Sequence, residues 1–124
     1  MNAFKIVGTY GTMYYVNSME AAVAWHSKAL GGLKPSFESP DWTEFPLPGG
    51  HSLCLHGLMP GQKNPQIGVL IIKVKNLDAL IPHLNSLNVE IMTPKNEVHP
   101  GAYCLDILDD SKNRMSFYEN TNEA

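Results

Sequence analysis

The residues with the clearest chemical potential are a cysteine and a histidine two positions apart, Cys54 and His56. The alternation of apolar and polar residues over 51–56 predicts a strand on which Ser52, Cys54 and His56 share one face. A thiolate beside an imidazole is a nucleophile with its base, or part of a metal site. Side chains at this spacing point parallel, about 7 Å apart. A buried cysteine that acts as a small hydrophobe is therefore the favoured interpretation of Cys54.

Tyr118 adds a hydroxyl near the end of a second predicted strand, and is the third candidate for catalysis after Cys54 and His56. The remaining histidines lie in different predicted elements, and their spacing matches no ligand motif. They are His26, His51, His83 and His99. We expect His26 to be structural, and the sequence predicts neither a metal nor a cofactor.

Two segments that begin with the same pattern must position these side chains. Residues 13–22 and 71–80 align as an apolar strand, a valine, a polar pair and the start of a helix. In the first copy, Asn17 and Glu20 form a predicted capping box, and the helix runs to about Leu30 before Gly31-Gly32. The chain is therefore predicted to contain two similar halves.

The second helix carries a stripe of leucines but also Pro82, which breaks a helix interior. A start at Asp78 moves Pro82 to the end of the first turn, with Asp78 as the cap. Each half then ends in a predicted β-hairpin. The hairpins are 42–47 with 51–56 across the turn 48–50, and 101–108 with 114–119 across the turn 109–113.

Composition excludes several classes of partner. The chain has 124 residues, 44% of them apolar, which suits one domain with a sizeable core. A net charge of -3 with nine Lys and Arg indicates no binding to nucleic acid or to an anionic membrane. Residues 1–5 form no apolar signal region, and no apolar run approaches the roughly 18 residues of a spanning helix. We expect a cytoplasmic protein with two reduced cysteines.

Several segments together resemble the vicinal oxygen chelate superfamily, which includes glyoxalase I, extradiol dioxygenases and bleomycin-resistance proteins. They are 15–20, 24–26, 30–31, 41–42 and 109–119. The resemblance implies an α+β fold of two tandem βαβββ modules, whose curled antiparallel sheet surrounds a cleft. It implies a single domain over 1–124, with halves at about 4–57 and 66–120 and a linker at 58–65.

Enzymes of this superfamily hold a divalent metal at four positions, which the resemblance places at Gly11, Cys54, Val69 and Ser116. One soft ligand is too few for such a metal. A shift by one residue would bring in Thr12, Leu70 and Phe117, which are no better ligands. We therefore do not expect metal-dependent isomerase or dioxygenase activity at this site.

Strand alternation from these positions predicts a mostly apolar cleft with a few polar groups, as in small-molecule pockets. The predicted ligand-binding residues are Met13, Tyr15, Ser52, Cys54, His56, Ile71, Lys73, Ser116 and Tyr118. By the same resemblance, a loop over 95–101 is where relatives often close over the cleft, which would bring Glu97 and His99 towards a ligand. A solvated loop is the favoured interpretation.

The leading hypothesis is a small-molecule-binding protein whose cleft lacks the usual metal ligands. By resemblance to the bleomycin-resistance proteins, it would be a homodimer that holds its ligand between two chains. One alternative is an enzyme of the superfamily, a lyase, dioxygenase or transferase, with a non-standard metal or a metal-free site at Cys54, His56 or Tyr118. Another is an interaction module whose cleft is filled by Met13, Ile71 and Tyr118.

Overall fold

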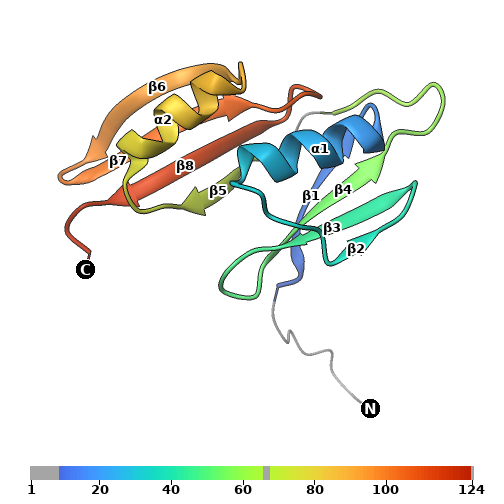
Figure 1. Cartoon of the computed structure of the whole chain (residues 1–124), viewed down its shortest axis with the longest axis horizontal. Coiled ribbons are helices and arrows are strands. Elements are labelled where there is room, and N and C mark those ends of the chain that lie inside the picture. The colour runs from blue at the N-terminus through green and yellow to red at the C-terminus, as the bar shows by residue number, and fades with distance from the viewer. Residues whose placement is uncertain (1–8, 66–67, 124) are drawn as a thin grey trace, which may run out of the picture.

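The computed structural model describes residues 9–65 and 68–123, and its elements follow the order β-α-β-β-β twice. The first half is β1 (Gly11–Val16), α1 (Met19–Ala29), β2 (Phe37–Glu38), β3 (Trp42–Pro46) and β4 (Ser52–Gly57). The second half is β5 (Leu70–Lys73), α2 (Leu77–Ser86), β6 (Glu90–His99), β7 (Ala102–Leu108) and β8 (Arg114–Asn120). The predicted β-α-β-β-β order of the two halves is confirmed, and the halves lie side by side (Figure 1). Their predicted starts at residues 4 and 66, and the segment 1–5, lie outside the described residues.

Each half forms a four-stranded sheet, with the strand orders β1-β4-β3-β2 and β5-β8-β7-β6. The hairpins are antiparallel as predicted, but β1 runs parallel to β4, and β5 runs parallel to β8. The sheets are thus mixed rather than wholly antiparallel. The reason is that the helix returns the chain to the starting end of the sheet, so the first and last strands share a direction.

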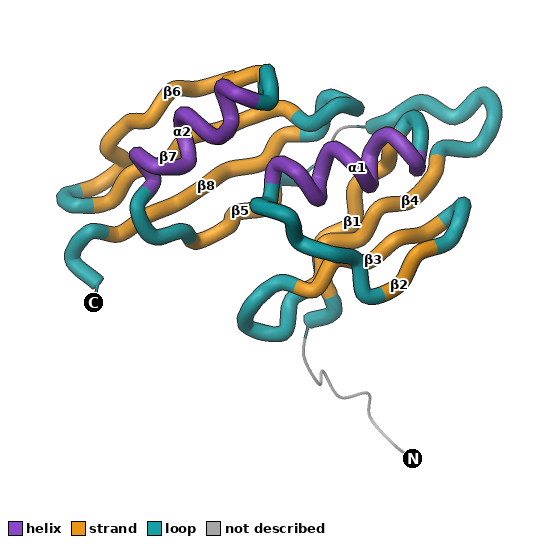
Figure 2. Tube along the Cα trace, viewed as in Figure 1, coloured by secondary structure: helices purple, strands orange, loops and turns teal. Residues whose placement is uncertain are grey.

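One face of each sheet is covered by its own helix (Figure 2). Alternation along the strands sends the apolar side chains to this face, where they form the core. Core residues of the first half include Tyr14, Val16, Phe45, Leu53 and Leu55, and those of the second half include Leu70, Leu105, Ile107, Met115 and Phe117. The opposite face of each sheet carries no helix. Neither described helix is long and apolar enough to cross a membrane.

Helix α1 begins one residue later than the predicted capping box. Its cap is Ser18, whose Oγ accepts a hydrogen bond from the Ala21 N–H at 3.3 Å. Asn17 is not the cap, and its N–H donates to Ser111 Oγ in the second half at 2.9 Å rather than to Glu20 as in the predicted capping box. The predicted stop is confirmed, since Gly31 and Gly32 both have positive φ angles, of 75° and 88°.

The predicted cap of the second helix was wrong. Helix α2 begins at Leu77, its cap is Asn76 with a φ angle of 62°, and no side-chain cap bond comes from within this segment. Instead, the carboxylate of Glu119 on β8 accepts the N–H groups of Asn76 and Leu77, at 2.7 and 2.9 Å. Asp78 forms an ion pair with Lys95 at 2.7 Å. The cap of α2 is therefore a contact between elements distant in the chain.

Replacing Glu119 with alanine should lower the melting temperature by a few degrees, because two helix N–H groups lose their acceptor. These hydrogen bonds hold the pKa of Glu119 below its usual value. The stabilisation is present at neutral pH and is lost as the pH falls through this lowered pKa, so the two proteins should converge in acid. Thermal unfolding at pH 7 and pH 3 measures both effects. The control is Glu20→Ala in the exposed first turn of α1, and an equal loss in the control would contradict the cap.

Candidate functional site

The helix-free face of the first sheet carries all five of the ligand-binding residues predicted in this half. Strands β1 and β4 pair in a register that places Met13 beside Cys54 and Tyr15 beside His56. Ser52 lies two residues before Cys54 on β4 and therefore shares its face. The prediction from strand alternation therefore brings these side chains together correctly.

Strand β3 adds two residues to this face that the sequence analysis missed. Trp42 pairs with His56, and Glu44 pairs with Cys54. The signal was available, because the predicted hairpin places alternate residues of both of its strands on one face. We call these seven residues the first helix-free face: Met13, Tyr15, Trp42, Glu44, Ser52, Cys54 and His56.

Aromatic rings surround His56. Its ring centroid lies 5.2 Å from that of Tyr15 and 5.8 Å from that of Trp42, the latter nearly edge-on at 87°. The ring is also fixed by a hydrogen bond between its Nδ1 and the carbonyl of Gly57, at 2.7 Å, in which the nitrogen must be the donor. The three rings thus form an ordered, half-buried aromatic cluster.

Glu44 places a negative charge beside this cluster. Its carboxylate accepts the Tyr10 hydroxyl at 2.6 Å and the Trp42 Nε1–H at 2.8 Å. These two hydrogen bonds lower the pKa of Glu44, the one from Tyr10 most strongly, so the group is ionised at neutral pH. The face combines aromatic rings with a fixed anion.

Cys54 is 2% exposed at the centre of this face. Burial raises the pKa of its thiol, and the nearby charge of Glu44 raises it further. A nucleophilic cysteine needs the opposite shift, towards the thiolate. The surroundings of Cys54 therefore suit a small buried hydrophobe rather than an activated nucleophile.

The other predicted ligand-binding residues lie on the helix-free face of the second sheet. There Ile71 pairs with Ser116, and Lys73 pairs with Tyr118. We call these four residues the second helix-free face. Lys73 forms an exposed ion pair with Glu123 at 3.1 Å. Ile71 is 63% exposed, and Met13 on the first face is 40% exposed, so neither fills a cavity in this chain.

The predicted loop at 95–101 was wrong over most of its length. Residues up to His99 belong to β6, which pairs with β7 through several register shifts. Glu97 accepts the Gly101 N–H at 3.3 Å, and His99 Nε2 lies 3.4 Å from the Tyr118 hydroxyl. Irregular pairing of this kind weakens the alternation by which strands are recognised in a sequence.

Among the described residues, two cavities are each lined by two of the predicted ligand-binding residues. One, of about 500 Å³, is lined by Ile71 and Lys73 together with Thr12 and His51. The other, of about 550 Å³, is lined by Met13 and Tyr15 together with Asn64. Neither joins the two helix-free faces.

The superfamily's first metal position cannot accept a larger residue. A Cβ atom on Gly11 would lie 2.2 Å from the carbonyl oxygen of Ser52, on the neighbouring strand. Val69 and Ser116, at two other positions, are poor ligands for a divalent metal. In the described residues, one set of three His, Cys, Asp or Glu side chains brings its ligand atoms within 4.8 Å of one another: His26, Asp109 and Asp110. These residues lie apart from the predicted cleft.

No protein-family model and no curated protein matches this sequence. Solved structures do match it. A glyoxylase/bleomycin resistance protein/dioxygenase domain from Frankia sp. EAN1pec has a TM-score of 0.74 at 19% identity, covering 94% of this chain and 99% of that one. A lactoylglutathione lyase from Agrobacterium tumefaciens has a TM-score of 0.74 at 16% identity, covering 94% and 96%. A glyoxalase/bleomycin resistance protein from Catenulispora acidiphila has a TM-score of 0.69 at 20% identity, covering 90% and 98%. The chain therefore has the fold of the vicinal oxygen chelate superfamily.

Proposed function

We propose that this protein binds a small, partly aromatic, positively charged molecule on its first helix-free face. The observation that carries the proposal is the ionised carboxylate of Glu44, which accepts the Trp42 Nε1–H at the edge of the aromatic cluster of Trp42, His56 and Tyr15. Aromatic faces attract cations, and a fixed anion adds a charge partner that a neutral ligand would not use.

The residues at the superfamily's metal positions support binding without that metal. Gly11 offers no side chain, and Cys54 is a thiol whose burial keeps it protonated. Conversion of the ligand through a metal at this place, or through Cys54 as a nucleophile, would require donors that these residues do not supply.

A homodimer is part of the proposal. The apolar residues Met13 and Ile71, on the helix-free faces, are 40% and 63% exposed, and Val69, just before β5, is 43% exposed. A second copy of the chain would cover these side chains and enclose a ligand between the first helix-free face of one copy and the second helix-free face of the other.

Isothermal titration calorimetry with the planar cation proflavine tests this function. We expect saturable binding, about fivefold weaker in Glu44→Gln, because that change removes the charge and keeps the size of the side chain. Glu38→Gln, on the exposed strand β2, is the matched control and should bind as the unaltered protein does. Equal affinity for the planar anion 9-anthracenecarboxylate, or no effect of Glu44→Gln, would contradict the proposal.

A further inference from the structure

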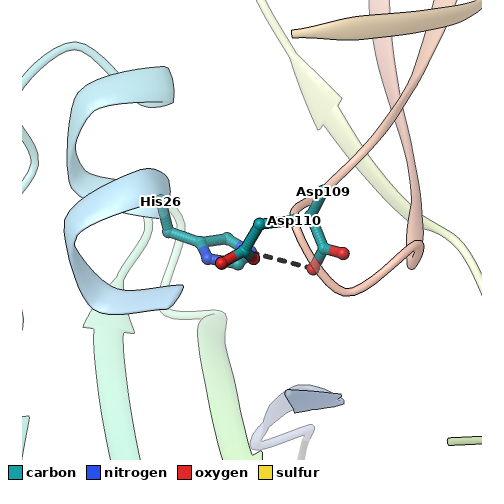
Figure 3. Close-up of side chains that lie close together, drawn as sticks. All are labelled: His26, Asp109 and Asp110. Atoms are coloured by element: carbon teal, nitrogen blue, oxygen red, sulfur yellow. Dashed lines mark ion pairs between the residues drawn. The ribbon is translucent and has the colours of Figure 1, made fainter. Parts of the chain in front are cut away.

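Three potential metal ligands converge where the two halves of the chain meet. His26 projects from α1, and Asp109 and Asp110 belong to the turn between β7 and β8 (Figure 3). Their ligand atoms lie within 4.8 Å of one another. Asp109 and His26 are buried, whereas Asp110 is exposed and leaves one side of the cluster accessible to solvent.

The imidazole of His26 has a buried nitrogen without a hydrogen-bond partner. The side chain is 0% exposed, and its Nδ1 lies 2.7 Å from the carbonyl oxygen of Ala22, to which it must donate. In a neutral ring Nε2 then carries a lone pair. That atom makes no hydrogen bond, although it lies 3.3 Å from Asp109 Oδ2 and the ring points at the carboxylate (Figure 3). A lone pair facing a buried carboxylate is unfavourable unless a cation lies at this place.

The geometry suits a metal ion as that cation. Two ligands at about 2.0 to 2.1 Å from a tetrahedral zinc ion lie about 3.3 Å apart. The distance between His26 Nε2 and Asp109 Oδ2 is 3.3 Å. Histidines that bind metals usually donate their other N–H to a carbonyl or carboxylate, as Nδ1 of His26 does to Ala22. Asp109 is likewise held, since its Oδ1 accepts the Asn113 N–H at 2.7 Å.

We propose that His26, Asp109 and Asp110 bind a divalent transition-metal ion of the zinc type, which joins α1 of the first half to the β7–β8 turn of the second half. The exposed Asp110 completes the site by a rotation of its side chain, and water fills the remaining position. This site is structural and is separate from the ligand-binding face proposed above. The competing cation is a proton on Nε2, which would make a plain imidazolium–carboxylate pair.

Titration of chelator-treated protein with Zn²⁺ at pH 7.5 tests the site. Calorimetry should give one ion per chain with a dissociation constant in the micromolar range or below. Asp110→Asn should weaken binding at least tenfold. Asp110 is exposed, so this variant should fold, with an unchanged circular dichroism spectrum in the absence of metal. Asp41→Asn, an identical change at another exposed aspartate, is the control and should bind as the unaltered protein does.

Co²⁺ gives a second readout that does not depend on the variants. We expect the visible absorption of tetrahedral Co²⁺ without the near-ultraviolet band of a thiolate ligand. Failure to bind Zn²⁺ saturably up to 1 mM, or equal binding by Asp110→Asn, would overturn the site in favour of the proton. A thiolate band would overturn it in favour of a cysteine ligand.

Discussion

Replacement of Asp109 with alanine is expected to reduce the free energy of unfolding of the metal-free protein by about 4 kcal/mol, because several buried N–H groups lose their acceptor together. The side chain is 3% exposed. Its Oδ1 accepts the N–H groups of Ser111 and Asn113 at 2.9 and 2.7 Å, and its Oδ2 accepts the Asn113 Nδ2–H at 3.0 Å. The buried ring of His26 would also lose the carboxylate that lies 3.3 Å from its Nε2.

Urea unfolding followed by tryptophan fluorescence measures this loss. The matched control is Asp110→Ala, the neighbouring and exposed aspartate of the same turn, which should change the free energy by less than about 1 kcal/mol. If Asp109→Ala loses no more free energy of unfolding than its control, the turn between β7 and β8 does not hold the two halves together through Asp109.

Replacement of Tyr14 with phenylalanine should reduce the free energy of unfolding by about 2 to 3 kcal/mol at pH 7, because a buried N–H and a carbonyl lose their partner. Tyr14 is 2% exposed, and its hydroxyl lies between the two halves. It accepts the Leu70 N–H at 2.7 Å and donates to the carbonyl of Arg114 at 2.6 Å.

The effect of Tyr14 should depend on pH. Burial raises the pKa of its hydroxyl to about 12. Because this value lies above the value of about 10 in the unfolded chain, the stabilisation is complete below pH 10 and is lost as the pH rises from 10 to 12. The stability difference between the unaltered protein and Tyr14→Phe should therefore shrink across this range. Urea unfolding at pH 9, 10 and 11 measures it, and a constant difference would contradict the account.

The repeat in the sequence was sufficient to predict the two halves, because each helix and hairpin is encoded by local patterns. The errors lie where a distant residue replaces a local one. Glu119 caps α2 from β8, so the local candidate Asp78 is not needed as a cap. The N–H of Asn17 donates to Ser111 Oγ, and the cap of α1 is Ser18. Such contacts depend on how the elements pack against one another, and the periodicity of the sequence carries no information about that packing.

In the candidate sites, too, features encoded by local patterns could be predicted, and contacts between distant elements could not. Alternation placed Tyr15, Cys54 and His56 correctly on one face, because neighbouring strands fix the positions of each other's side chains. It was not applied to β3, and Glu44 was therefore missed. The grouping of His26 with Asp109 could not be predicted in this way, since it joins a helix of one half to a turn of the other.

Anomalous diffraction at the zinc edge, from crystals of this protein soaked in Zn²⁺, tests most directly the claim that metal binding and ligand binding are separated in this fold. We expect a peak among the side chains of His26, Asp109 and Asp110, and no peak at the first helix-free face. A zinc ion bound by Cys54, Glu44 or His56 would contradict it, because that face would then hold a metal at the place where we propose an organic ligand.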